Sequence, residues 1–147
     1  MRVREKKLLE AMKMRRRKIP LDKVQDAFNA AIRRRDSKCM VRDYEPCSGP
    51  LECSHFHTVG GNGSLRFYPP NAYAQCQRHH WNHHSKPDCR FYETWILENH
   101  KEDAEKMESL RHRFLRYTDE LKSEIIRLCD EDRLDDLKSL IESRLVI

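Results

Sequence analysis

Histidine is concentrated in one short part of this sequence. Six of the chain's eight histidines, three of its four glycines and one cysteine lie in the stretch SHFHTVGGNGSLRFYPPNAYAQCQRHHWNHH, residues 54–84. Imidazole groups bind transition metals, and they accept or donate a proton near neutral pH. The clustering therefore predicts a metal centre, an acid–base site, or both.

Four cysteines lie close to this stretch, namely Cys39, Cys47, Cys53 and Cys76. Clustered cysteines beside histidines favour metal binding over disulfides in an intracellular chain. Cys76 and His79 are three residues apart at an expected helix start, a spacing typical of zinc ligands. We predict a structural zinc site formed by Cys39, Cys47, Cys76 and His79, with Cys53 as the alternative to Cys47.

The other histidines are spaced so that a second centre is geometrically possible. His55 and His57 are two residues apart, which places both side chains on one side of a strand. His80 and His84 are four residues apart and share one face of a helix. This face is adjacent to the one that carries His79, and it can meet the histidines of the strand.

Positive charge is concentrated near the N-terminus. Residues 1–35 contain thirteen Lys or Arg against four Asp or Glu, a balance of +9, whereas the whole chain carries +5. Such clusters attract polyanions by displacing counterions from phosphates, and the alternatives are a solvated helix face or acidic lipid. The expected DNA contacts are Arg15, Arg16, Arg17, Arg33, Arg34, Arg35, Arg66 and Arg78.

Helices are expected on both sides of a glycine-rich segment. Between residues 38 and 70, all four glycines and four of the six prolines indicate loops and short strands. Gly60, Gly61 and Gly63 permit positive φ where the chain reverses and leave room for a DNA backbone, and the alternative is a plain flexible turn. Apolar spacing and composition predict helices over 5–18, 21–35, from Ala74 or Cys76 past His84, and over 88–100, 103–117 and 119–145.

The C-terminal helices supply most of the expected core. Thr118 is a candidate N-cap for the helix at 119–145, because its side chain can accept a backbone N–H of the first turn. Trp81 and Trp95 are expected to be buried rather than to stack on bases. Further candidate core positions are Leu110, Phe114, Leu121, Ile125, Leu128, Leu134, Leu137 and Leu140.

The length of 147 residues suits one domain with helical extensions. The expected divisions are a basic segment at 1–20, a core at 21–100 and a helical extension at 101–147. No apolar run approaches the roughly 20 residues of a membrane span, and no secretion signal is visible. We expect a mostly helical α+β protein of the cytoplasm, with no membrane partner.

Several motifs bear a family resemblance. The order His55, Asn71, then His80 or His84, framed by cysteines, resembles the HNH, or ββα-metal, nucleases. More specifically, RRRDSKC, SHF, LRFYPPNAYAQCQRH and FYETWILENH are similar to the NinG/Rap family of phage recombination endonucleases, over roughly residues 21–100. Three positions depart from the family pattern: Arg42 and His79 stand where cysteines are usual, and Ser54 stands where many HNH enzymes have a metal ligand.

The resemblance implies a zinc-stapled ββα-metal core, similar to a treble clef, with flanking helices and with HNH endonuclease activity on DNA. It implies that His55 is the general base and that Asn71 orients it, through the side-chain amide or by pinning the loop. His80 and His84 would hold Mg²⁺ or Mn²⁺, with His57 as a reserve ligand. His83 would be a phosphate contact or a bystander.

The same resemblance implies branched recombination intermediates, such as Holliday junctions or D-loops, as substrates. It also implies the cytoplasm of a bacterial host as the location, and symmetrical cutting of a junction would need a homodimer. Two alternatives stay open. One is a zinc-stabilised nucleic-acid-binding module without cleavage activity, and the other is a zinc-stabilised adaptor, which leaves the N-terminal charge unexplained.

Overall fold

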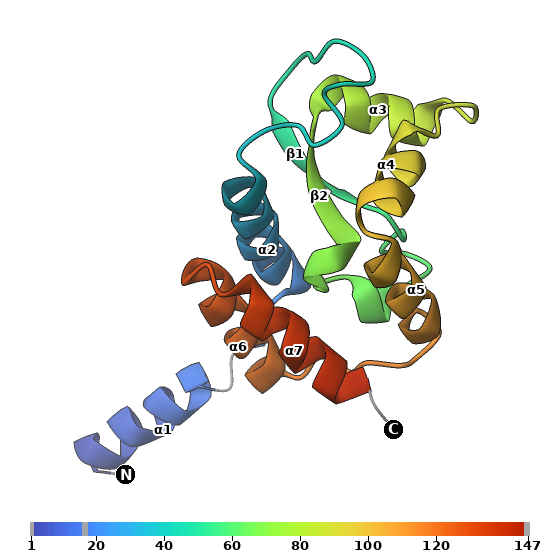
Figure 1. Ribbon diagram of the computed structural model, residues 1–147. Helices are drawn as coiled ribbons and strands as arrows, with labels where there is room; N and C mark the ends of the chain where they lie inside the picture. Colours follow the sequence, from blue (N-terminus) through green and yellow to red (C-terminus); the bar gives the residue numbers. More distant parts are fainter. Residues whose placement is uncertain (1, 16–17, 146–147) are drawn as a thin grey trace.

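The computed structural model describes residues 2–15 and 18–145, with the side chains of 13–15 left undescribed. Helices surround one small antiparallel sheet (Figure 1). None of the described helices is both long and apolar enough to cross a membrane. The order is α1 (Val3–Arg15), α2 (Leu21–Asp36), β1 (Leu51–His55), β2 (Ala72–Cys76), α3 (Gln77–Ser85), α4 (Phe91–Asn99), α5 (Lys101–Leu110), α6 (Asp119–Asp130) and α7 (Leu134–Leu145).

The predicted mostly helical α+β class is confirmed, and so is the N-cap at Thr118. Its Oγ1 accepts the backbone N–H of Leu121 at 3.2 Å and starts α6. The helix expected over 119–145 is instead two helices, because the chain turns at Asp132, whose φ is 56°. The helix expected over 103–117 ends at Leu110, and an irregular segment leads from there to Thr118.

The two strands pair along their full length, with Leu51 opposite Cys76 and His55 opposite Ala72. A helix start at Ala74 is therefore wrong, and α3 begins directly after Cys76. The glycine loop does not use the positive φ that its glycines permit. Gly49 is the one glycine with positive φ (83°), and a methyl group added at Gly60 or Gly63 would meet nothing within 4 Å.

Two hydrophobic clusters hold the helices to the sheet. In the larger cluster α2 packs against α6, α7 and the end of α5, through fully buried residues such as Phe28, Ile125 and Leu137. The smaller cluster includes Tyr92 and Ile96, which are the buried residues of α4.

The structure also corrects part of the predicted core. Two of the aromatic residues expected to be buried are exposed: Phe114 is 87% and Trp81 69% accessible to solvent. Trp95 is half-buried and packs against the smaller cluster, while Leu140 is half-buried at the edge of the larger one. The other predicted core positions of the C-terminal helices are buried.

Arg35 ties the end of α2 to the sheet. Its guanidinium donates to the carbonyl oxygens of Ala72 at 2.6 Å and Pro69 at 3.2 Å, and it pairs with Asp36 at 2.7 Å. The second carboxylate oxygen of Asp36 accepts the backbone N–H of Ala74 at 2.8 Å. Because these groups satisfy one another at the sheet edge, Arg35 has a structural role that does not require DNA.

Arg34 also makes contacts inside the fold. It pairs with Asp132 at 2.7 Å and donates to the carbonyl oxygen of Cys129 at 2.9 Å, which joins α2 to the turn between α6 and α7. Arg33 is half-buried. In the first arginine triplet, the side chain of Arg15 and the whole of Arg16 and Arg17 lie outside the described residues, so their expected DNA contacts stay predictions.

Candidate metal centres

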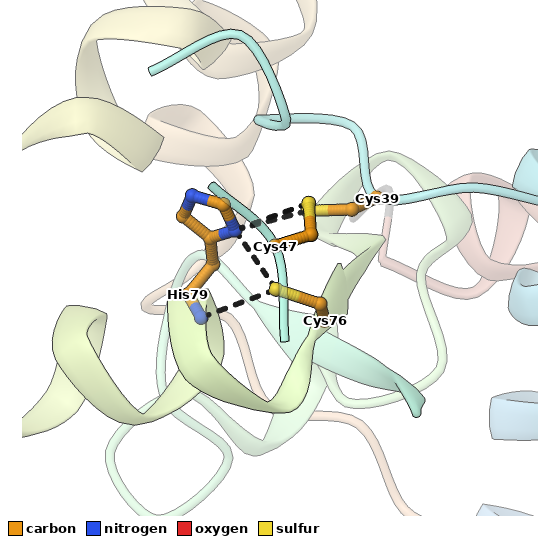
Figure 2. A group of neighbouring side chains, drawn as sticks. All are labelled: Cys39, Cys47, Cys76 and His79. Carbon is orange, nitrogen blue, oxygen red and sulfur yellow. Dashed lines mark hydrogen bonds between the residues drawn. The ribbon is translucent and has the colours of Figure 1, made fainter. Parts of the chain in front are cut away.

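Four metal-binding side chains converge from three parts of the chain. Cys39 and Cys47 lie between α2 and β1, Cys76 ends β2, and His79 lies in the first turn of α3 (Figure 2). One ligand atom from each lies within 4.8 Å of all the others. Cys53 packs instead against the larger hydrophobic cluster, so the structure brings Cys47, and not Cys53, into this group.

The geometry of this group fits a tetrahedral cation. Nδ1 of His79 lies 2.9 Å from Sγ of Cys76, 3.4 Å from Sγ of Cys39 and 3.7 Å from Sγ of Cys47. With zinc–sulfur bonds of about 2.3 Å and zinc–nitrogen bonds of about 2.0–2.1 Å, the nitrogen and each sulfur of a tetrahedral site are about 3.6 Å apart. One N–H cannot satisfy three sulfurs, whereas one ion can bind all four atoms. The group can therefore hold a metal such as zinc.

The position of Cys76 at the N-cap of α3 prepares one thiol for metal binding. Burial raises the pKa of the Cys39 thiol, and burial together with the neighbouring sulfurs raises that of Cys47 to about 12. Burial also acts to raise the pKa of Cys76, but backbone N–H groups of His79 and Ser48 donate to its sulfur and lower the pKa overall. Cys76 is therefore the thiol that ionises most readily, and binding a cation would release the other protons.

A second group of polar side chains lies where α3 passes β1. Nδ1 of His80 lies 3.0 Å from Oε1 of Glu52, and Nε2 of His80 lies 3.1 Å from Nε2 of His84. Because a carboxylate accepts the hydrogen bond, Nδ1 of His80 carries the proton and Nε2 presents a lone pair. Histidine ligands of metals almost always donate the other ring N–H to such a partner. The arrangement of His80 thus suits a metal ligand.

The spacing of the two imidazoles also suits a shared ion. For metal–nitrogen bonds of about 2.0–2.2 Å, two nitrogens at 90–109° on one ion are about 2.9–3.4 Å apart. Burial lowers the pKa of His84, and the charge of His80 lowers it further, which favours the neutral form that binds metals. Within the described residues, only the cysteine-containing group offers three mutually close ligand atoms. An ion between His80 and His84 would therefore need water or phosphate oxygens as further ligands.

His55 ends β1 with its ring held on both sides. Its Nε2 donates to the carbonyl oxygen of Arg66 at 2.9 Å, and its ring stacks on Phe28 of α2 with centroids 5.9 Å apart. Nδ1 is then the nitrogen free to accept a proton. Burial lowers the pKa of His55, the hydrogen bond to the Arg66 carbonyl opposes this, and the charge of Arg66, followed by those of His80 and His84, lowers the pKa further. His55 is therefore neutral near pH 7.

Asn71 is fully buried and fixes the loop that follows β1. Its Oδ1 accepts the backbone N–H of His57 at 2.8 Å, and its Nδ2 donates to the carbonyl oxygens of His57 at 3.0 Å and Leu65 at 3.2 Å. These bonds tie together the two chain segments that carry His55 and Arg66. Of the two roles considered for Asn71, they match the pinning of the loop.

The other two candidate histidines lie against aromatic rings. His57 lies edge-on to Phe56 with centroids 4.8 Å apart, and burial lowers its pKa. His83 lies against Tyr92 of α4 at 4.9 Å, and burial, with the charges of His84 and His80, lowers its pKa to about 4. The structure therefore brings neither of them into a described group of metal ligands.

Ser54 is used within the fold, and the acidic partner near α3 is Glu52. The hydroxyl of Ser54 accepts from Gln75 at 2.6 Å, and its carbonyl oxygen accepts from Tyr92 at 2.7 Å. Glu52 was not singled out in the sequence. The strand pattern could have indicated it. Alternate residues of a strand share a face, so Glu52, two residues before Ser54 in β1, lies on the same face of the sheet as Ser54.

The zinc hypothesis predicts different outcomes for two cysteines on neighbouring segments. Purified protein should hold about one zinc per chain, and Cys76→Ser should lose the metal and unfold at a lower temperature, because metal binding at such a site contributes to folding. Cys53→Ala, the control, should keep its zinc. Metal analysis and thermal unfolding with and without a chelator measure both. Unchanged zinc and melting in Cys76→Ser would contradict the site.

Residues 1–139 match the family model described as Bacteriophage Lambda NinG protein. No curated protein and no solved structure matches the chain. The matched range contains the basic N-terminal residues, the sheet, α3 and both groups of candidate ligands. The chain therefore belongs to the bacteriophage lambda NinG protein family.

Proposed function

We propose that this protein is a metal-dependent HNH-type endonuclease that hydrolyses phosphodiester bonds in DNA. The observation that carries the proposal is the pair formed by His80 and His84, oriented by Glu52 and acting electrostatically on a neutral His55. A protein that only binds DNA needs neither a metal-ready imidazole pair nor a partly buried neutral imidazole whose pKa that pair helps to lower. Phosphodiester hydrolysis needs both.

Each side chain then has a distinct task. Nδ1 of His55 accepts a proton from the attacking water, while the Arg66 carbonyl oxygen keeps the ring in place. Asn71 holds the loop that presents this carbonyl. His80 and His84 would hold a divalent ion, which would neutralise charge on the phosphate and on the departing oxygen. Imidazole ligands suit Mn²⁺ better than Mg²⁺, so Mn²⁺ should support the higher activity.

The cysteine-containing site is proposed to hold a structural zinc. Because Cys76 and His79 flank the start of α3, a bound ion would fix this helix relative to β2 and to the segment that carries Cys39 and Cys47. This would fix the helix from which His80 and His84 project. The zinc would thus support catalysis without taking part in it.

DNA is the proposed partner. Arg78 is exposed on α3, and α1, which carries Arg4, Lys6 and Lys7, projects away from the other helices (Figure 1). These cations suit phosphate contacts. On the basis of the family, we extend the proposal to branched recombination intermediates as substrates. We also propose that the protein acts as a homodimer, in the cytoplasm of a bacterial host.

A nucleic-acid-binding module without cleavage activity is the second candidate function. It is favoured by Ser54, which is buried, engaged with Gln75 and Tyr92, and so adds no ligand to the ion. Under this alternative, His80 and His84 contact phosphate or solvent, and substitution of His55 has no catalytic consequence.

The base assignment predicts a large loss of rate without a loss of binding. Wild-type protein with Mg²⁺ or Mn²⁺ should cut supercoiled plasmid and a synthetic four-way junction, and EDTA should stop the reaction. His55→Ala should bind the same DNA yet cut at least ~10² times more slowly. His83→Gln, which alters an imidazole on α3 outside the proposed chemistry, should keep most of the activity. Equal cutting by His55→Ala would reject the assignment.

The orienting role of Glu52 predicts a defect that excess metal repairs. Glu52→Ala should raise the Mn²⁺ concentration for half-maximal cleavage by about 10–100-fold, since the partner of a ligating histidine tunes metal affinity. At saturating Mn²⁺ most of the rate should return. Calorimetric titration of Mn²⁺ without DNA gives an independent reading, and Glu98→Ala on α4 is the control. A Mn²⁺ dependence identical to wild type would exclude this role.

A further inference from the structure

The segment between α5 and α6 is held at both ends against the loop that follows β1. At one end the hydroxyl of Ser64 donates to the carbonyl oxygens of Leu110 at 3.3 Å and Arg111 at 3.4 Å. At the other end the hydroxyl of Tyr117 donates to the carbonyl oxygen of Gly63 at 2.6 Å. The segment therefore has a defined path although it forms no helix.

Side chains alternate along this segment. Leu115 and Tyr117 pack against the larger hydrophobic cluster, whereas Phe114 and Arg116 are exposed. Residues two apart in an extended chain point to the same side, so Phe114 and Arg116 share the outward side. Phe114 is the most exposed of the large apolar side chains described, at 87%. The fold holds an aromatic ring in water where it contributes nothing to the core.

The exposed ring borders a basic groove. The groove has a volume of about 510 Å³, and its walls come from the glycine loop and from residues 111–117. Three arginines line it, Arg66, Arg111 and Arg113, and no carboxylate does. Glu108 lies 3.1 Å from Arg111, but in the described part of the chain no carboxylate lies within 4 Å of Arg113 or Arg116. The groove therefore attracts anions.

The groove starts beside the candidate general base. Arg66, one of the residues that line it, accepts the hydrogen bond of His55 through its carbonyl oxygen. Gly61 and Gly63 also line the groove and add no side chain to it, and a methyl group added at Gly63 would meet nothing within 4 Å. A nucleic-acid strand in the groove would thus pass close to His55.

We propose that Phe114 stacks on an unpaired base of branched or single-stranded DNA, while Arg113 and Arg116 bind the neighbouring phosphates. Aromatic rings beside cations form stacking platforms for single strands, and stacking is worth about 1–3 kcal/mol per base. The bases of a continuous duplex are stacked on each other and present no free face, whereas a branch point does. This inference rests on the proposed endonuclease function and assigns the recognition of branched substrates to this groove.

Binding measured in EDTA tests the proposal independently of cleavage. Phe114→Ala should weaken binding to a single strand and to a four-way junction by about 10-fold or more, and change binding to a linear duplex less than about 2-fold. With 2-aminopurine at the branch, wild type should change its fluorescence and Phe114→Ala should not. Phe114→Trp should preserve binding, and Trp81→Ala, which removes an exposed ring outside the groove, should have no effect.

Substitution of the cations should give a different pattern. Arg116→Gln should weaken binding to all three DNAs alike and reduce the salt dependence by about one unit of slope, because phosphate contacts carry no information about pairing. Since the side chains are exposed, all variants should melt like wild type. Two results would overturn the proposal. One is wild-type protein that shows no preference for unpaired DNA, and the other is a Phe114→Ala variant that binds all three DNAs as tightly as wild type.

The two proposals can fail separately. Junction binding that depends on Phe114, in a protein that cuts nothing with any metal, would support the groove and overturn the nuclease. Metal-dependent cutting, together with DNA binding that does not depend on Phe114, would support the nuclease and overturn the role of the groove. A surface for a protein partner at Phe114 predicts this second pattern.

Discussion

The convergence of three sulfurs and one imidazole nitrogen is the constraint on which the candidate site depends. The sheet has only two strands of five residues, and a two-stranded ribbon has marginal stability without further packing. A tetrahedral ion bound by Cys39, Cys47, Cys76 and His79 would fix the end of β2, the start of α3 and the segment before β1 to one point. With that point fixed, His80 lies beside Glu52.

A second set of contacts holds the opposite side of the sheet without a metal. Arg35 and Asp36 bind the backbone of β2 from α2, and Asn71 fixes the loop between the strands. His55 lies between these ties, stacked on α2 and bonded to the loop. Asn71 and Asp36 are themselves buried and bonded, so the orientation of His55 is set before any substrate arrives.

Sequence reasoning reached the features that depend on local spacing. The ligands Cys76 and His79 and the cap Thr118 act within one helical turn, where spacing determines geometry. Glu52 was missed, and Phe114 was wrongly expected in the core, because the surroundings of both residues depend on segments distant in the sequence. Glu52 meets His80 through strand pairing, and Phe114 follows a helix that ends at Leu110, although apolar spacing alone predicts that it continues. Arg34 and Arg35 look like DNA contacts in the sequence, yet their partners lie on α6, the following turn and β2.

Anomalous diffraction from a crystal grown with Mn²⁺ tests the two-metal arrangement most directly. We predict a zinc peak about 2.3 Å from the sulfurs of Cys39, Cys47 and Cys76 and about 2.0–2.1 Å from Nδ1 of His79. We also predict a manganese peak bound by Nε2 of both His80 and His84. A cysteine group without metal, or manganese bound away from these two histidines, would contradict the arrangement.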